Sequence, residues 1–405
     1  MQEENFLVRE PLLNTQERVL GYELTWQRNV GAGGKCRVED ANELVRFVAA
    51  QVSETSTGSL LGEQVLFLDA SPELLTTGAF SQLPPKGTVL ALHEADLTDE
   101  DVIAEARALR AKGYGISLRN ANLATVNKQL LPLFTYIEAS VRAEDFATQL
   151  ETYRALELPM AVRMVARDVS TWEQYDFFAS QGVYAFVGQL HLTPRPSERA
   201  RDLSPQQTMI LQLMKMVKNG DDVRQLESVL KRDAALSYKL LRYINSAGFS
   251  LGCEIQSLKH AVTLLGYSPL YRWLALLLTT ATTSGYSPVL MQAAVIRGRF
   301  VELLGHGFLP KNEAENLFVA GMFSLLDRLL GVPMEDVLEK IPLSEAVSQA
   351  LLARQGIYGP FLALAEACEL NLADVESMAT SLCISANQVN QAQLSALAWV
   401  QGLTL

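Results

Sequence analysis

Short runs of β-branched and aromatic residues alternate, along the first half of the chain, with longer stretches whose apolar residues recur at three- and four-residue spacing. The short runs predict strands, and the longer stretches predict amphipathic helices. The predicted strands span residues 5–13, 19–27, 65–70, 88–93, 115–118, 136–141, 160–165 and 183–189. The strongest helices between them span residues 39–52, 99–112, 143–155 and 170–181.

The order of these elements predicts a barrel. The first two strands are joined by residues 14–18, a segment that suits a hairpin and is too short for a crossover helix. The later strands alternate with helices, which demands parallel strands and right-handed crossovers. Eight strands within residues 1–195 therefore predict a TIM-like (β/α) barrel with an antiparallel first strand.

The pattern changes in the second half of the chain. Pro194, Pro196 and Pro205 punctuate a polar segment at about residues 193–204, which we interpret as a linker. Beyond it the strand patterns vanish and amphipathic segments predict an all-α domain. The fold class is thus α/β plus all-α, with a barrel domain at 1–195 and a helical domain at 196–405. The predicted helices span residues 206–219, 225–233, 235–246, 257–265, 269–280, 288–304, 313–330, 333–340, 344–352 and 359–370.

Composition narrows the class of protein. The chain has 405 residues, 49% of them hydrophobic and 20% charged, which excludes disorder of the whole chain. A net charge of −11 leaves neither half basic, so we expect no nucleic-acid partner. Neither a signal peptide nor an apolar run of membrane-spanning length is found, and we expect a cytoplasmic protein with no membrane contact. The four cysteines lie far apart without a CxxC motif, which indicates reduced thiols.

Two motifs in the first half carry a resemblance. Arg9-Glu10-Pro11-Leu12-Leu13 is followed by Leu20-Gly21-Tyr22-Glu23-Leu24-Thr25. In these motifs and in its element order, the first half resembles the EAL-domain family, whose members hydrolyse cyclic di-GMP. The resemblance implies two divalent cations, usually Mg²⁺ or Mn²⁺, held by carboxylates at the carboxyl end of the barrel.

Three motifs in the second half carry another resemblance: LLRYINSAGF at 240–249, IQSLKHAVTLLG at 255–266 and FVAGMFSLLD at 318–327. They resemble the HDOD family, an output domain related to HD hydrolases. Together the two resemblances cover nearly the whole chain, and their order matches the EAL–HDOD signalling proteins.

Four positions on or directly after the first predicted strands show which residues of the implied metal site are present. Glu23 matches the Glu of the EAL motif, and Asp69 falls at a metal-binding asparagine of the family. Ala91 falls at a Glu ligand, so a methyl group replaces a carboxylate there. Glu94 matches the second Glu of the same run.

The later motifs have lost more of that chemistry. Arg119 and Asn120 fall at the family's Asp-Asp pair, and Glu138 and Ser140 fall at its Lys and Asp. A guanidinium places a permanent positive charge where the cations would lie. Because a single lost ligand already weakens metal-assisted catalysis greatly, the resemblance implies a degenerate EAL domain with no metal, no cofactor and no enzymatic activity.

Two environments are open for Arg119. Its guanidinium could contact a phosphate of a bound dinucleotide, or it could pair with Glu94 or Glu138 on neighbouring strands. We favour the ion pairs, because a carboxylate and a neighbouring guanidinium stabilise each other's charged forms.

The helical half gives a similar picture. The position of the His-Asp pair of HD hydrolases reads Ser324-Leu325, so no hydrolase site is expected there. Asn245, Ser246 and Ala247 belong to the HDOD motif and could face a partner. The alternative is a polar helix terminus whose side chains satisfy backbone groups.

These observations predict a non-catalytic bacterial signal-transduction protein, linked to cyclic di-GMP by family, that acts as a binding or scaffold module. Its partner is an unknown protein of a signalling pathway, and a homodimer stays open. We expect no binding of cyclic di-GMP, or weak binding. Two alternatives remain: a cyclic di-GMP phosphodiesterase with an unusual site, and a receptor that binds cyclic di-GMP without cleaving it.

Overall fold

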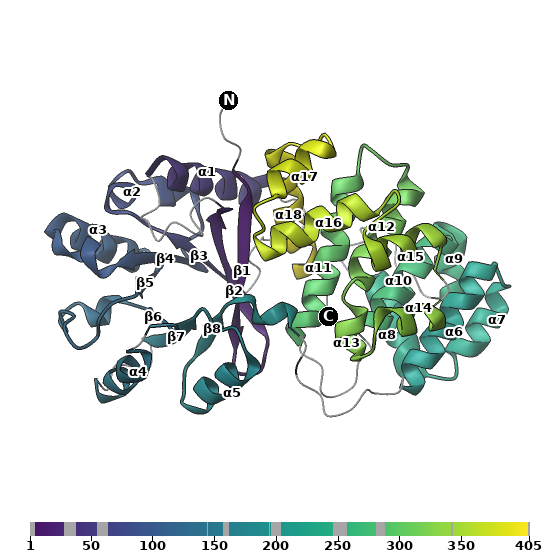
Figure 1. The fold of residues 1–405 in the computed structure, drawn as a ribbon, viewed down its shortest axis with the longest axis horizontal. Coiled ribbons are helices and arrows are strands. Elements are labelled where there is room, and N and C mark those ends of the chain that lie inside the picture. The colour runs from purple at the N-terminus through teal and green to yellow at the C-terminus, as the bar shows by residue number, and fades with distance from the viewer. Residues whose placement is uncertain are drawn as a thin grey trace. The chain divides into compact units, whose positions relative to one another are not determined.

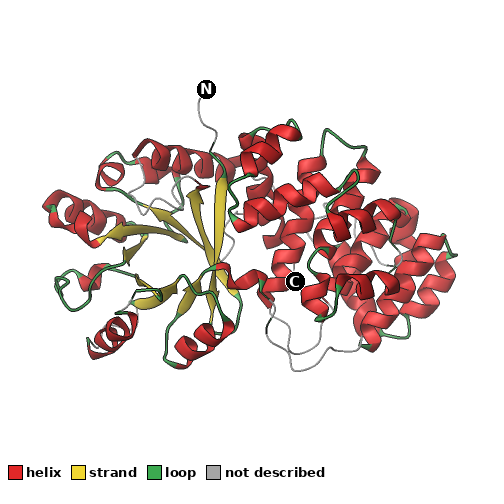
Figure 2. Ribbon diagram, in the orientation of Figure 1, coloured by secondary structure: helices red, strands yellow, loops and turns green. Residues whose placement is uncertain are grey.

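The computed structural model describes residues 5–27, 38–54, 64–143, 145–156, 162–193, 195, 204–245, 257–280, 288–341 and 343–403. The chain divides into two compact units, and the division falls after Thr193. Figures 1 and 2 show strands and helices in the first unit and helices in the second. Most of the predicted linker at 193–204 lies outside the described residues, so the boundary at 195 stays a prediction.

The first unit is a closed barrel with the strand order β1 to β8. Strand β1 (Leu7–Asn14) pairs antiparallel with both β2 (Val19–Trp26) and β8 (Ala185–Val187). Every other neighbouring pair is parallel. The predicted TIM-like barrel with an antiparallel first strand is confirmed. Its remaining strands are β3 (Val65–Asp69), β4 (Thr88–His93), β5 (Gly115–Arg119), β6 (Tyr136–Ser140) and β7 (Arg163–Arg167).

Helices surround these strands (Figure 1). Side chains cap the start of several of them: the Asp99 carboxylate accepts a hydrogen bond from the amide of Asp101, and the Thr171 hydroxyl accepts one from that of Gln174. The elements between strands are α1 (Val38–Glu54), α2 (Pro72–Thr76), η2 (Ala79–Gln82), η3 (Glu94–Thr98), α3 (Glu100–Ala111), η4 (Leu131–Leu133), α4 (Phe146–Ala155) and α5 (Trp172–Ser180), with η5 (Gln189–Leu192) after β8.

The barrel core has an apolar layer that includes Phe67, Val89, Tyr136 and Val165. Side chains two residues apart on a strand point to the same face. The next layer toward the carboxyl ends of the same four strands is therefore formed by Asp69, Ala91, Glu138 and Arg167. Charged side chains thus lie directly above the apolar core.

The second unit is built of helices. Among the residues that the structure describes, no helix is both long enough and apolar enough to cross a membrane. The helices are α6 (Pro205–Asn219), α7 (Val223–Leu230), α8 (Ala234–Ile244), α9 (Leu258–Leu265), α10 (Tyr267–Thr280), α11 (Pro288–Gly305), α12 (Lys311–Phe323), α13 (Leu326–Leu330), α14 (Met334–Lys340), α15 (Glu345–Ala353), α16 (Gly359–Leu370), α17 (Val375–Ser381) and α18 (Ala386–Gln401).

Several predicted boundaries differ from the structure. The single helix predicted at 313–330 is divided into α12 and α13, because Leu325 has φ −114° and ψ 6°. The Ser324 hydroxyl donates to the carbonyl of Gly321 at 2.6 Å, a local bond that competes with helix continuation. The strand predicted at 160–165 is β7, which extends to Arg167. Helices α2, α17 and α18 were missed.

Helices α11 and α12 approach closely at two glycines. A Cβ atom added to Gly321 would lie 2.9 Å from the carbonyl oxygen of Arg297 and 2.9 Å from the Cα atom of Gly298. Both contacts are with backbone, which cannot move away as a flexible side chain can. A side chain at this position therefore has to separate the two helices.

We expect Gly321→Ala to lower the free energy of unfolding by about 1–3 kcal/mol, the usual cost of overpacking. The measurement is urea unfolding of the full chain. Gln212→Ala on the exposed face of α6 is the control and should change the midpoint little. A Gly321→Ala midpoint equal to that of the control would contradict the close approach.

Candidate functional site

Five charged side chains converge at the carboxyl ends of the parallel barrel strands. We call Glu23, Asp69, Arg119, Glu138 and Arg167 the mouth cluster. Asp69, Arg119 and Arg167 are the last residues of β3, β5 and β7. Because the barrel brings the ends of its parallel strands to one rim, side chains far apart in the sequence meet there.

Arg119 lies at the centre of the mouth cluster. Its Nη2 atom is 2.8 Å from Glu23 Oε1 and 3.1 Å from Glu138 Oε2. Its Nη1 atom forms an ion pair with Asp69 Oδ1. One guanidinium, 6% exposed, therefore contacts all three carboxylates.

Arg167 supports two of the same carboxylates. Its Nη1 atom is 2.7 Å from Glu23 Oε2 and 2.6 Å from Glu138 Oε2. The Ser117 hydroxyl donates a 2.6 Å hydrogen bond to Glu138 Oε1. Glu138, 1% exposed, is thus held by two guanidiniums and a hydroxyl.

The mouth cluster contains three carboxylates and two guanidiniums, a net charge of −1 when all are ionised. Burial would raise the pKa of Glu138, but Arg119, Arg167 and the Ser117 hydrogen bond outweigh it and lower this pKa to about 2. Burial and Arg167 would lower the pKa of Arg119, but Glu138, Glu23 and Asp69 outweigh them and raise it. These charges are therefore mutually stabilised.

Burial is less fully offset at two other carboxylates of the mouth. Glu10 lies opposite Glu23 in the β1–β2 register, and burial, followed by repulsion from Glu23, raises the pKa of Glu10. Burial also raises the pKa of Asp69, and its ion pair with Arg119 does not fully offset this effect. Glu23 is held by short ion pairs with both guanidiniums, Arg119 at 2.8 Å and Arg167 at 2.7 Å.

The residues present do not fit the pair of divalent cations that the resemblance implies. Arg119 lies among the three carboxylates, and Ala91 adds no oxygen ligand from its side chain. Among the described residues, no group of three His, Cys, Asp or Glu side chains is arranged to hold a metal. The guanidiniums supply the positive charge that hard cations would otherwise supply.

Two of the predicted site residues on β4 and η3 lie outside these contacts. Ala91 is buried in the register beside Asp69 and contributes a methyl group. Glu94 Oε2 accepts a 3.1 Å hydrogen bond from the amide of Asn122. Of the two carboxylates expected to pair with Arg119, Glu138 does so and Glu94 does not.

Asn120 and Ser140 support the backbone around the cluster. Asn120 adopts φ 51°, in the left-handed region, and its amide donates to the carbonyl of Glu138 at 2.9 Å. The Ser140 hydroxyl is hydrogen-bonded to the Asp168 carboxylate. Both side chains are uncharged, so neither contributes to the charge balance of the mouth cluster.

Sequence reasoning placed Arg167 at an acidic motif of the EAL family but did not name it as a site residue, and it did not consider Ser117. Arg167 follows the apolar run Met164-Val165-Ala166 directly, as Arg119 follows Leu118. A charged residue at the end of a buried strand was the signal that could have identified it. Ser117 lies two residues before Arg119 and so faces the same side of β5.

The HDOD candidates are partly described. Asn245 lies just after α8, and its Nδ2 atom donates to the carbonyl of Leu241 at 3.0 Å, as a helix terminus requires. Ser246 and Ala247 lie outside the described residues. Ser324, at the position of the His-Asp pair, accepts a 2.9 Å hydrogen bond from Arg297, which is buried and paired with Glu366 and Glu369.

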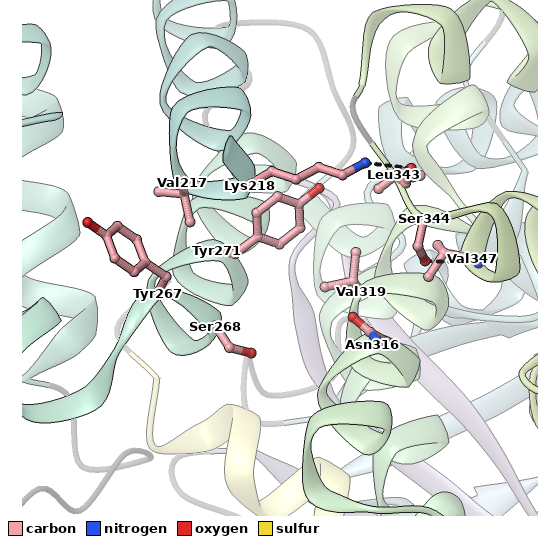
Figure 3. A pocket seen from close by; sticks show the side chains of 10 residues that line it. All are labelled: Val217, Lys218, Tyr267, Ser268, Tyr271, Asn316, Val319, Leu343, Ser344 and Val347. Carbon is pink, nitrogen blue, oxygen red and sulfur yellow. Dashed lines mark hydrogen bonds between the residues drawn. The ribbon is translucent and has the colours of Figure 1, made fainter. Parts of the chain in front are cut away.

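A pocket of about 200 Å³ opens among α6, α10, α12 and α15 (Figure 3). Three valines, Val217, Val319 and Val347, give it apolar surface. Lys218 Nζ donates a 2.8 Å hydrogen bond to the carbonyl of Leu343, and no described carboxylate forms an ion pair with it. The polar lining also includes Tyr267, Ser268, Tyr271, Asn316 and Ser344.

Comparison with known proteins identifies related chains. Residues 203–330 match the family model of the HDOD domain. The chain is 25% identical to the cyclic di-GMP phosphodiesterase CdgJ of Vibrio cholerae, over 98% of this chain and 93% of that protein. It is 26% identical to the uncharacterized protein YuxH of Bacillus subtilis, over 98% of both chains.

Among solved structures, the chain is similar to the cyclic di-GMP complex of the phosphodiesterase PaMucR. The match is 18% identical, covers 48% of this chain and 99% of that chain, and has a TM-score of 0.38. The EAL enzyme Bd1971, bound to cAMP and cyclic di-GMP, matches at 13% identity over 46% of this chain and 61% of that chain, with a TM-score of 0.37.

These comparisons confirm the predicted resemblance to EAL–HDOD proteins and correct one prediction drawn from it. The expectation that the chain is not an enzyme is contradicted by its similarity along nearly its whole length to CdgJ, which is named a phosphodiesterase. The expectation was inferred from a count of the positions at which the family's metal ligands are replaced. That count does not include the similarity of the whole chain to a protein named a phosphodiesterase.

The lowered pKa of Glu138 predicts a pH dependence of stability. Its folded pKa of about 2 lies below the ordinary value of 4.5, so ionised Glu138 contributes stability that is present above pH 4.5 and lost as the pH falls toward 2. The contribution is about 3 kcal/mol. Glu138→Gln should flatten this dependence and lower the free energy of unfolding at neutral pH.

Chemical unfolding at a series of pH values measures both effects. Glu94→Gln is the matched control, because Glu94 lies outside the mouth cluster, and its pH profile should follow that of the unsubstituted chain. Equal profiles for Glu138→Gln and Glu94→Gln would show that the ion pairs of Glu138 do not stabilise the fold.

Proposed function

We propose that this chain, which is related along nearly its whole length to EAL–HDOD proteins, acts in cyclic di-GMP signalling by binding a protein partner through its helical unit. The link to cyclic di-GMP rests on the Vibrio cholerae relative. The HDOD match over residues 203–330 supports a role for the helical unit as the output part of the protein. In this role the barrel serves as the regulatory part.

The pocket beside Lys218 is the observation that carries this proposal. Most of its lining residues, from Val217 to Val319, belong to the segment that matches the HDOD domain. Its apolar surface and convergent polar groups are typical of binding sites. The Lys218 ammonium has no carboxylate partner among the described residues, so it can attract an acidic group of a bound protein.

Charge reversal at Lys218 tests this role. We expect Lys218→Glu to weaken capture of the partner from host extract by about tenfold, because the new carboxylate repels an acidic group at the pocket. Lys215→Glu is the matched control, since Lys215 is exposed on the same helix and does not line the pocket. The full-length variants are compared as baits by quantitative mass spectrometry.

A protein retained by the unsubstituted chain and by Lys215→Glu, but depleted with Lys218→Glu, is the expected result. Equal recovery with Lys218→Glu would exclude the pocket as the binding site.

A second candidate function is hydrolysis of cyclic di-GMP, which the similarity to CdgJ favours. At the mouth cluster, every carboxylate is paired with a guanidinium. Hydrolysis there would require Glu23, Asp69 and Glu138 to exchange Arg119 for another partner. Weak binding of the dianionic dinucleotide stays our prediction, since the cluster carries net negative charge.

Incubation with cyclic di-GMP and Mg²⁺ or Mn²⁺, followed by chromatography, tests this candidate. If the mouth is the active site, Glu23→Gln should lower turnover by at least about tenfold, because a buried carboxylate of the reacting site is lost. Glu94→Gln should keep turnover. No loss of cyclic di-GMP with the unsubstituted chain would exclude the candidate.

A further inference from the structure

The segment from α6 to α8 differs in charge from the chain as a whole. Residues 204–245 contain seven Lys or Arg and four Asp or Glu, a net charge of +3, whereas the whole chain carries −11. Three of the four acids have local partners: Asp222 and Asp233 accept hydrogen bonds from backbone amides, and Glu227 pairs with Lys231. Most cations of this segment therefore have no carboxylate partner within it.

Helix α8 is anchored by an apolar stripe. Leu236, Leu240 and Ile244 recur at every fourth position and are at most 1% exposed. The helix contacts α7 and α10 within the second unit, where Figure 1 labels all three. Because residues 234–244 include no Asp or Glu, the opposite face of this anchored helix carries no negative side chain.

Three side chains form the exposed surface that we call the α8 face: Tyr238, Lys239 and Arg242. Tyr238 is 66% exposed, the largest fraction among the exposed large hydrophobic residues that the structure describes. Arg242 lies four residues after Tyr238 and three after Lys239, so the side chains are neighbours on the helix surface. Neither cation has a carboxylate partner among the described residues.

Arg242 differs in this respect from other arginines of the helical unit. Arg272, Arg297 and Arg299 each form an ion pair with a glutamate, so their charge is already used within the fold. The charge of Arg242 is not used in this way. Exposed tyrosine and arginine side chains are enriched among the residues that contribute most to protein–protein binding. The α8 face therefore has the composition of a contact surface.

Charge and size favour an acidic protein segment over a nucleic acid as the ligand of the α8 face. Nucleic-acid binding depends on neutralising many phosphates along a backbone, and a chain with a net charge of −11 repels such a polyanion. Two cations one helical turn apart match a few carboxylates instead, because salt confines their attraction to about 8 Å. Tyr238 adds an aromatic ring that an apolar side chain of the same segment can cover.

We propose that the α8 face binds a protein segment in which acidic side chains are interspersed with apolar ones. Carboxylates of this segment pair with Lys239 and Arg242, and its apolar side chains cover Tyr238. None of these three residues lines the pocket beside Lys218. The inference goes beyond the proposed function, because it requires neither that pocket nor cyclic di-GMP.

The probe is a short fluorescein-labelled peptide that is rich in glutamate and contains a few leucines. Fluorescence anisotropy with the full chain measures its affinity. We expect binding at low salt that weakens at least about tenfold at about 300 mM NaCl, because salt screens exposed charges. Lys239→Glu combined with Arg242→Glu should weaken binding at least about tenfold, and Tyr238→Ala about threefold. A peptide with glutamine in place of every glutamate should not bind.

Lys112→Glu combined with Lys128→Glu is the matched control for the charge reversal. Both lysines are exposed on the barrel, and the pair changes the net charge equally. Phe177→Ala, which truncates another exposed aromatic ring, is the control for Tyr238→Ala. Both controls should keep the affinity. Equal weakening by the two double variants would attribute binding to net charge alone and would overturn the proposal, as would the absence of binding to the unsubstituted chain.

Two further comparisons identify the place of binding and the class of ligand. Lys218→Glu should retain the peptide; release by Lys218→Glu, with retention by Lys239→Glu combined with Arg242→Glu, would place the peptide in the pocket and overturn the proposal. An oligothymidylate of equal charge should bind more weakly than the peptide. Tighter binding of the oligonucleotide that the same double variant abolishes would assign a nucleic acid to the α8 face, which also overturns the proposal. The capture experiment with Lys218→Glu is separate, so failure of either proposal can be told from failure of the other.

Discussion

Neutralisation of buried carboxylates by Arg119 is the interaction on which the barrel mouth depends. Glu23 and Glu138 are 3% and 1% exposed, so water cannot stabilise their charge. An isolated ionised carboxylate in such a place costs several kcal/mol. Arg119 offsets this cost because a guanidinium has several donors in one plane and can contact three acids together. Arg119 therefore joins the three carboxylates into one ion-pair cluster.

The helical unit uses the same device between helices. Arg272 on α10 donates to Glu302 on α11 at 2.9 Å and lies 4.0 Å from the ring centroid of Phe318 on α12. Arg299 donates to the same carboxylate at 2.7 Å. Removing one partner of such a pair leaves a buried charge unpaired, which is strongly destabilising. In both units, a largely buried arginine is paired with a buried glutamate.

The fold could be predicted from the sequence because hydrophobic periodicity and the lengths of the connections are local properties of the chain. The five-residue link at 14–18 required a hairpin, and the antiparallel β1 follows from it. The partners of Arg119 were harder to predict from the sequence. They depend on which side chains point into the barrel and on the register from β2 to β6. Glu138 was anticipated from its neighbouring strand, whereas Glu23 and Asp69 were not named as its partners. Arg167 was read only as a lost acidic position, and its pairing with Glu23 and Glu138 depends on the register of β7, which the sequence pattern does not give.

The antiparallel β1 has a mechanical consequence for the barrel. Closure depends on the seam between β1 and β8, where Leu12, Leu13 and Asn14 register with Val187, Phe186 and Ala185. This seam joins the two ends of the barrel sequence through a short ladder. The ion pair between Glu23 of β2 and Arg167 of β7 spans both seam strands. The mouth cluster therefore also connects β2 with β7 across β1 and β8, which adds a side-chain link to the short backbone ladders at this closure.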